Sequence, residues 1–148
     1  MLVYRVCNRI EIEEILSKKR FDSIGSIYEV NHNNNHDYTP NTFYMHFFPK
    51  KEDIFHINNV LKRFICTYEI PDDLLVFYEG MGLYDDFTCH KEEFLVEFAV
   101  PSKLISISFL RRIEVLPFDY TYLDFLKNGD YASTLLYDGT KEPNLRKS

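Results

Sequence analysis

The chain has 148 residues, of which 45% are hydrophobic, 27% charged and 16% aromatic, with 13 Phe, 11 Tyr and no Trp. This length suits one domain, and the aromatic side chains suffice for a core without disulfides or a metal. The net charge of −6 gives no general attraction to nucleic acid. No apolar run reaches the roughly 18 residues of a membrane span. The three cysteines are widely spaced, which indicates a reducing, cytoplasmic setting.

The first segment predicts a buried strand followed by an amphipathic helix. Residues 2–7 are mostly apolar, and Asn8 with Glu11 three positions later is typical of a capped helix start. The apolar positions that follow share one helical face: Ile12, Ile15 and Leu16. Arg5 is unusual in such a strand, because a buried charge needs a partner. Two interpretations remain open, an ion pair with a glutamate and a guanidinium that binds a phosphate.

Residues 22–42 predict a long loop, because the Asn- and His-rich stretch 31–36 and Pro40 favour turns. A loop of this length is typical of a lid, a binding loop or a disordered insertion. Further along the chain, apolar periodicity predicts four strands and two helices. The expected strands are 43–48, 64–70, 94–100 and 105–116, and the expected helices are 51–62 and 120–127.

These elements predict a single α+β domain over residues 1–128, followed by a C-terminal extension or tail over 129–148. Its sheet should be mostly antiparallel and split or strongly bent, with two or three helices at the periphery. Residues 67–75 and 97–105 repeat one pattern, in which a strand is followed by proline, two polar residues and two aliphatic ones. Since proline halts a strand ladder, the repeat predicts two equivalent strand ends.

Two strands carry candidate site residues. In the strand around Glu97, side-chain alternation places Glu93, Leu95, Glu97 and Ala99 on one face. A carboxylate there either is solvated on an open sheet face or is held in a cleft for a purpose. In the strand 42–48, Tyr44 and His46 share a face, where they can stack a flat ring and exchange a proton, or form part of a packed aromatic core.

Other chemistries have weaker signals. His32 and His36 lie in the Asn-rich loop, and the pair Cys89-His90 lacks partners at zinc-site spacing, so we expect no metal site. The chain contains no P-loop, GxGxxG or GxSxG motif.

Over residues 2–101 the order of elements resembles the ADP-ribosyltransferase-like fold. The resemblance is carried by Tyr4-Arg5 in a first strand, the following helix, the aromatic strand 43–48 and the late segment Glu97-Phe98-Ala99-Val100-Pro101. In that family the first strand holds NAD through Arg or His, a middle strand lines the nicotinamide pocket, and a later strand carries the catalytic Glu.

The resemblance implies a role for four residues. Arg5 would grip the phosphate or ribose of NAD, and Tyr44 would stack on nicotinamide with His46 in the same NAD-binding strand. Glu97 would bond the nicotinamide ribose and stabilise an oxocarbenium-like transition state. An alternative register takes Glu93 as the catalytic residue, on the same face as Glu97. Leu95 stands where arginine-modifying members carry a second Glu.

The function implied is that of an NAD-dependent ADP-ribosyltransferase, a small intracellular toxin, effector or defence enzyme. NAD is its substrate, and a protein or nucleic acid is its acceptor, with no membrane involved. The alternative is a non-enzymatic interaction module on the same scaffold, whose aromatic residues and long loop form a partner surface. A third hypothesis, an RNA phosphotransferase, requires several basic residues to converge, and the acidic net charge disfavours it.

Overall fold

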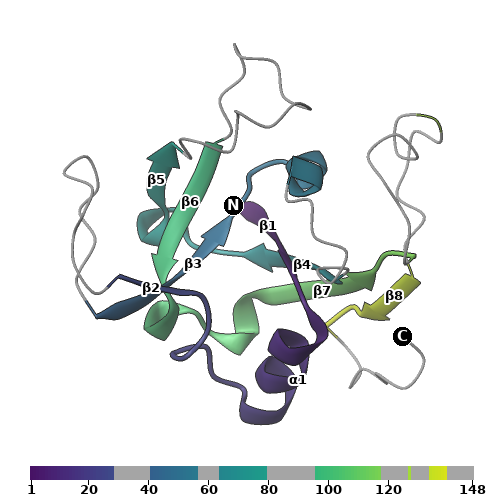
Figure 1. Ribbon diagram of the computed structural model, residues 1–148, viewed down its shortest axis with the longest axis horizontal. Coiled ribbons are helices and arrows are strands. Elements are labelled where there is room, and N and C mark those ends of the chain that lie inside the picture. Colours follow the sequence, from purple (N-terminus) through teal and green to yellow (C-terminus); the bar gives the residue numbers. More distant parts are fainter. Residues whose placement is uncertain (29–40, 57–63, 80–95, 118–126, 128–133, 140–148) are drawn as a thin grey trace.

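In the computed structural model, the described part of the chain forms two four-stranded sheets and an α-helix packed against them (Figure 1). It describes residues 1–28, 41–56, 64–79, 96–117, 127 and 134–139. Every strand pairing within these residues is antiparallel. The predicted α+β class and the divided, mostly antiparallel sheet are confirmed. Two or three helices were expected, and the described residues contain one whole α-helix together with Lys127, which is also helical.

The first sheet has the strand order β1-β4-β7-β8. Its strands are β1 (Leu2–Cys7), β4 (Phe64–Glu69), β7 (Leu110–Val115) and β8 (Thr134–Tyr137). The strand predicted at 105–116 is shorter than expected, because a 3-10 turn at Ile107–Phe109 precedes β7. The Ser106 side chain accepts a hydrogen bond from the Ser108 amide and so favours a turn there. The predicted C-terminal extension contributes β8, so the sheet continues beyond residue 128.

The second sheet has the order β2-β3-β6-β5. Its strands are β2 (Ser26–Tyr28), β3 (Thr42–Phe47), β6 (Val96–Pro101) and β5 (Val76–Glu79). The prediction of a continuous loop over 22–42 is wrong at β2, which pairs with β3. Residues 29–40, including the Asn- and His-rich stretch, lie outside the described residues.

A backbone bridge joins the two sheets. The Tyr4 amide donates to the Phe48 carbonyl at 2.8 Å, and the Phe48 amide donates back at 2.7 Å. Between the sheets lies the core, which draws side chains from both of them and from the helix. Its fully buried members include Val3, Cys66, Ile113, Met45, Phe47, Ile12 and Ile15.

The helix α1 (Arg9–Lys18) begins as the sequence predicts. The Asn8 side chain accepts a hydrogen bond from the Glu11 amide at 3.0 Å, which satisfies an amide that has no partner within the helix. Lys19 ends the helix in a left-handed conformation. The helix predicted at 51–62 is observed as a 3-10 helix at Lys51–His56, while residues 57–63 and most of 120–127 lie outside the described residues.

The two proline repeats form matching strand ends, as predicted. Pro71 and Pro101 each precede a 3-10 turn, Asp72–Leu74 and Ser102–Leu104. The Ser102 hydroxyl donates to the Ile24 carbonyl, which ties the end of β6 to the segment before β2. This contact links β2 and β6, the two strands that flank β3 in the second sheet.

Candidate functional site

The second sheet has one face in the core and one face that carries the predicted site. Met45 and Phe47 of β3 pack into the core with Val100 of β6. Because strand side chains alternate, Tyr44 and His46 lie on the opposite face, together with Ala99 and Glu97 of the neighbouring strand β6. Tyr44 is 4% exposed and Glu97 is 7% exposed, so this second face is also covered.

Glu97 and His46 are neighbours on that face. The His46 Nδ1 and Glu97 Oε2 atoms lie 4.0 Å apart. Burial raises the pKa of Glu97 to about 7, although the positive charge of Arg5 opposes the shift. Burial, aided by the charge of Arg5, lowers the pKa of His46 to about 4. Near neutral pH the site therefore holds an uncharged imidazole beside a carboxyl group that loses its proton far less readily than an exposed one.

Arg5 projects from the core side of β1, on the same face as Val3 and Cys7. Its Nε and Nη2 atoms donate to the two carboxylate oxygens of Glu11 at 2.9 and 2.7 Å. Burial alone would lower the pKa of Arg5, but the hydrogen bonds and charge of Glu11 outweigh burial, so this pKa is raised. Of the two interpretations of Arg5, the structure contains the ion pair with a glutamate.

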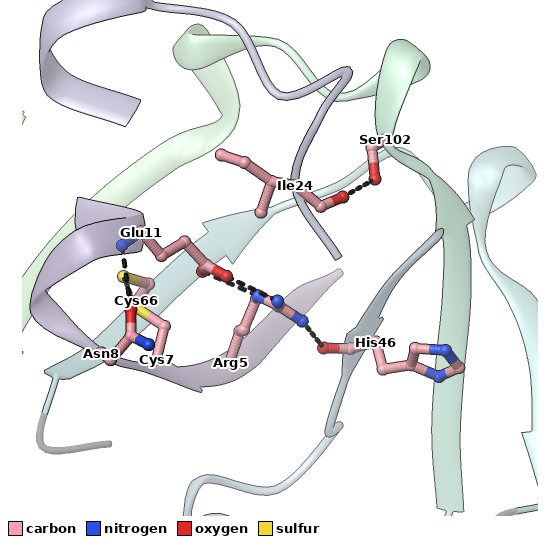
Figure 2. A network of polar contacts seen from close by, with 8 residues as sticks. All are labelled: Arg5, Cys7, Asn8, Glu11, Ile24, His46, Cys66 and Ser102. Atoms are coloured by element: carbon pink, nitrogen blue, oxygen red, sulfur yellow. Dashed lines mark hydrogen bonds and ion pairs between the residues drawn. The ribbon is translucent and has the colours of Figure 1, made fainter. Parts of the chain in front are cut away.

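The remaining arm of Arg5 reaches the backbone of the site strand. Its Nη1 atom donates to the His46 carbonyl oxygen at 3.2 Å, while the imidazole extends away from Arg5 (Figure 2). Alternate carbonyls of a strand point to the same edge. On this edge β2 pairs with Tyr44, Arg5 binds the His46 carbonyl, and β1 bonds Phe48. Arg5 thus supplies a hydrogen-bond donor to the edge of β3, between the pairing of β3 with β2 and the backbone bridge to β1.

The structure therefore places three of the four predicted site residues on one face of the second sheet and brings two of them, His46 and Glu97, close together. Tyr44, His46 and Glu97 share one face of adjacent strands. Arg5 lies on the other side of β3, and it contacts the site through the backbone of His46 and through its charge. Glu93, the alternative catalytic residue, lies outside the described residues, as do His32, His36 and the pair Cys89-His90.

Sequence reasoning missed Glu11 as the partner of Arg5. The sequence placed Glu11 in the first helical turn and gave it a capping role. The Glu11 amide does take part in the cap, because it donates a hydrogen bond to the Asn8 side chain. The Glu11 carboxylate instead accepts hydrogen bonds from Arg5. The available signal was the short separation between a buried arginine and an acidic residue across a tight strand-to-helix connection.

This arrangement can hold and exchange a proton, and it can place a carboxylate beside a developing positive charge. A carboxyl group with a pKa near the working pH suits both tasks. Within the described ranges, no group of three or more His, Cys, Asp or Glu is placed to hold a metal ion. In the same part of the chain, no helix combines the length and apolar character that crossing a bilayer requires.

The chain was compared with protein-family models, with curated proteins and with solved structures. None of the three comparisons gives a match. The functional argument therefore depends on the residues of the site itself.

Proposed function

We propose that the protein is an NAD-dependent ADP-ribosyltransferase-like enzyme in which Glu97 is the catalytic carboxylate. One observation carries this proposal: the buried carboxyl group of Glu97 lies 4.0 Å from the imidazole of His46, on the sheet face that also carries Tyr44. Isolated carboxyl groups seldom occupy such positions, because burial disfavours their ionised form. A perturbed carboxyl group beside an imidazole is typical of a functional site.

The divided antiparallel sheet gives further support. It is the architecture that the resemblance to ADP-ribosyltransferases implies, and its site residues come from strands in the order which that resemblance expects. In this assignment Tyr44 stacks on the nicotinamide ring. Arg5 was expected to grip the NAD phosphate or ribose. In the structure the Arg5 guanidinium is bound by Glu11, and Arg5 contributes to the site by holding the His46 backbone.

The reaction breaks the glycosidic bond between the nicotinamide nitrogen and C1′ of its ribose. The bonding electron pair moves to the ring nitrogen, so the cationic ring leaves as neutral nicotinamide. The ribose carbon becomes electron-poor, and the Glu97 carboxylate stabilises that charge. A nucleophilic atom of the acceptor then bonds to C1′ and loses its proton.

The test is nicotinamide release from NAD by the wild type and by Glu97→Gln. The amide has nearly the same shape and lacks the negative charge, so release should fall by about 100-fold or more. Glu13→Gln is the matched control, because Glu13 is exposed and pairs with Arg9 on the outer surface of α1. Equal release by wild type and Glu97→Gln, with Glu13→Gln also unchanged, would refute the role of Glu97.

A non-enzymatic interaction module is the second candidate, and the Arg5–Glu11 ion pair favours it. A guanidinium engaged by both oxygens of a carboxylate serves the scaffold in this structure. Calorimetric titration with NAD distinguishes the candidates. Saturable binding that Tyr44→Ala weakens supports the enzyme, whereas absence of binding by the folded protein supports the module.

A further inference from the structure

We propose that His46 is a positioning residue whose Nδ1–H group donates a hydrogen bond to the Glu97 carboxylate and orients it when a cationic ring binds beside it. This inference rests on the proposed function, because the cation in question is the nicotinamide ring of NAD. It goes further by giving His46 a role toward Glu97, in place of a contact with the cofactor.

The geometry of adjacent strands supports this role. His46 pairs with Ala99 across β3 and β6, so its side chain and that of Glu97 are diagonal neighbours on one face. The 4.0 Å separation of Nδ1 and Oε2 exceeds a hydrogen bond by about 1 Å. Catalytic hydrogen bonds are often this long before substrate binds and shorten in the complex. Both side chains are largely buried, at 19% and 9% exposure, so water competes weakly with their contact.

The backbone of His46 is held in place on the other side. Arg5 binds the His46 carbonyl, and Glu11 of α1 fixes the Arg5 guanidinium with two hydrogen bonds. The imidazole extends away from Arg5 and from this anchored backbone (Figure 2), and its Nδ1 atom lies 4.0 Å from Glu97 Oε2. An anchored side chain keeps its partner within reach at little entropic cost.

The imidazole stays uncharged in this role, because burial and the charge of Arg5 disfavour its protonated form. The Glu97 O–H bond breaks and its proton passes to solvent, and the Nδ1–H group of His46 then donates to the resulting carboxylate. The carboxylate faces the incoming cationic ring, and it takes a proton back from solvent after neutral nicotinamide has left. Among the described side chains, the other ionisable groups near the pair are Tyr44 on β3 and Arg5 on β1 with its partner Glu11.

Three substitutions separate this role from a purely structural one. Asn places a side-chain amide near the position of Nδ1, Gln places one near Nε2, and Phe keeps the ring volume with no polar atom. We expect His46→Asn to behave like the wild type. We expect His46→Gln and His46→Phe to lose the interaction with the Glu97 carboxylate. Melting temperature and the amide NMR spectrum identify the variants that fold.

The deciding measurement is the titration of the Glu97 carboxyl carbon by NMR with ¹³C-labelled glutamate, assigned by comparison with Glu97→Gln. His46→Phe should raise the Glu97 midpoint by about one pH unit, because its charged form loses a polar neighbour, while His46→Asn stays near the wild-type midpoint. In nicotinamide release, His46→Phe should lower kcat about tenfold with KM nearly unchanged, and His46→Asn should restore most of it.

The two readouts also separate this inference from the proposed function. If His46→Phe leaves the Glu97 midpoint at its wild-type value, the inference is wrong, whatever the activity. If the midpoint shifts as expected and no form releases nicotinamide, the coupling holds and the proposed reaction is wrong. Since Gln carries its amide at the Nε2 position, a His46→Gln variant that matches wild type in both readouts would overturn the assignment to Nδ1.

Discussion

At Glu97, stability and chemistry make opposite demands. Burial keeps the carboxyl group protonated up to about pH 7, and its ionised form is the one that the proposed reaction uses. A charge that the fold disfavours is a common feature of functional sites, because the surrounding structure supplies the stability that the site lacks. His46 has the same character, since burial disfavours its charged form.

This conflict predicts that Glu97→Gln stabilises the protein at alkaline pH. The folded pKa of about 7 lies above the unfolded value of about 4.3, so the folded state binds the proton more tightly. Wild-type stability should therefore fall as pH rises between these values and stay low above pH 7. Urea unfolding at pH 8 should show Glu97→Gln more stable by roughly 2–4 kcal/mol, with a small difference at pH 4. An equal difference at both pH values would contradict this account.

Strand alternation explains why part of the site could be predicted from the sequence. A period of two places Tyr44 and His46 on one face, and the same rule places Glu97 with Ala99. The rule says nothing about which strands are neighbours, so the contact between His46 and Glu97 was outside its reach. The two interpretations of Arg5 also could not be separated, because its glutamate partner depends on how α1 folds back against β1.

Among the elements, the strands with long apolar or aromatic runs were predictable. The β1, β3 and β4 strands appear within a residue of the predicted bounds, and α1 begins at the predicted cap. The short strands β2 and β5 were missed, because three or four residues give too little periodicity to recognise. They form through pairing with β3 and β6, a tertiary effect that local sequence does not encode.

The β2–β3 pair depends on a glycine at its start. Gly25 has a φ of +107°, and a Cβ atom there would lie 2.7 Å from the Tyr44 carbonyl carbon. Gly139 has a similar φ of +93°, but its nearest neighbour, the Arg111 carbonyl oxygen, would be 3.8 Å away. The two positions share the backbone strain of an added side chain and differ in the clash.

We therefore expect Gly25→Ala to be much more destabilising than Gly139→Ala. Strain alone should cost about 1–2 kcal/mol at each position, and the clash with β3 should add about 2 kcal/mol at Gly25. Urea unfolding of both variants measures the difference. Because the clash displaces Tyr44, Gly25→Ala should also weaken NAD binding. Equal destabilisation by the two substitutions would show that β3 yields to the added atom.

At the scale of the whole molecule, the core between the two sheets contains two free cysteines. Cys7 and Cys66 are buried free thiols on neighbouring strands, with their Sγ atoms 3.8 Å apart. Burial raises the pKa of the Cys7 thiol, and the hydrogen bond with Cys66 adds to the shift. Since the thiolate is the reactive form, these thiols should be inert while the core is intact.

Thiol labelling should consequently report global opening of the protein. In a Cys89→Ser background, which leaves these two thiols, an aromatic disulfide reagent should react at least about 10³-fold more slowly than with a free cysteine. Both thiols should react together in urea above the unfolding midpoint. Rapid labelling of one thiol in native buffer would show that β1 separates from β4 without global unfolding.

The pairing of β1 with β4 has a consequence for synthesis of the chain. Ribosomes add about 5–20 residues per second, so β1 and α1 emerge seconds before β4, which begins at Phe64. The helix α1 can form within microseconds, whereas β3 lacks its partner β6 until translation passes Pro101. The nascent N-terminal portion therefore exposes two strands with open edges, and chaperones that shield such edges should engage it before the later strands arrive.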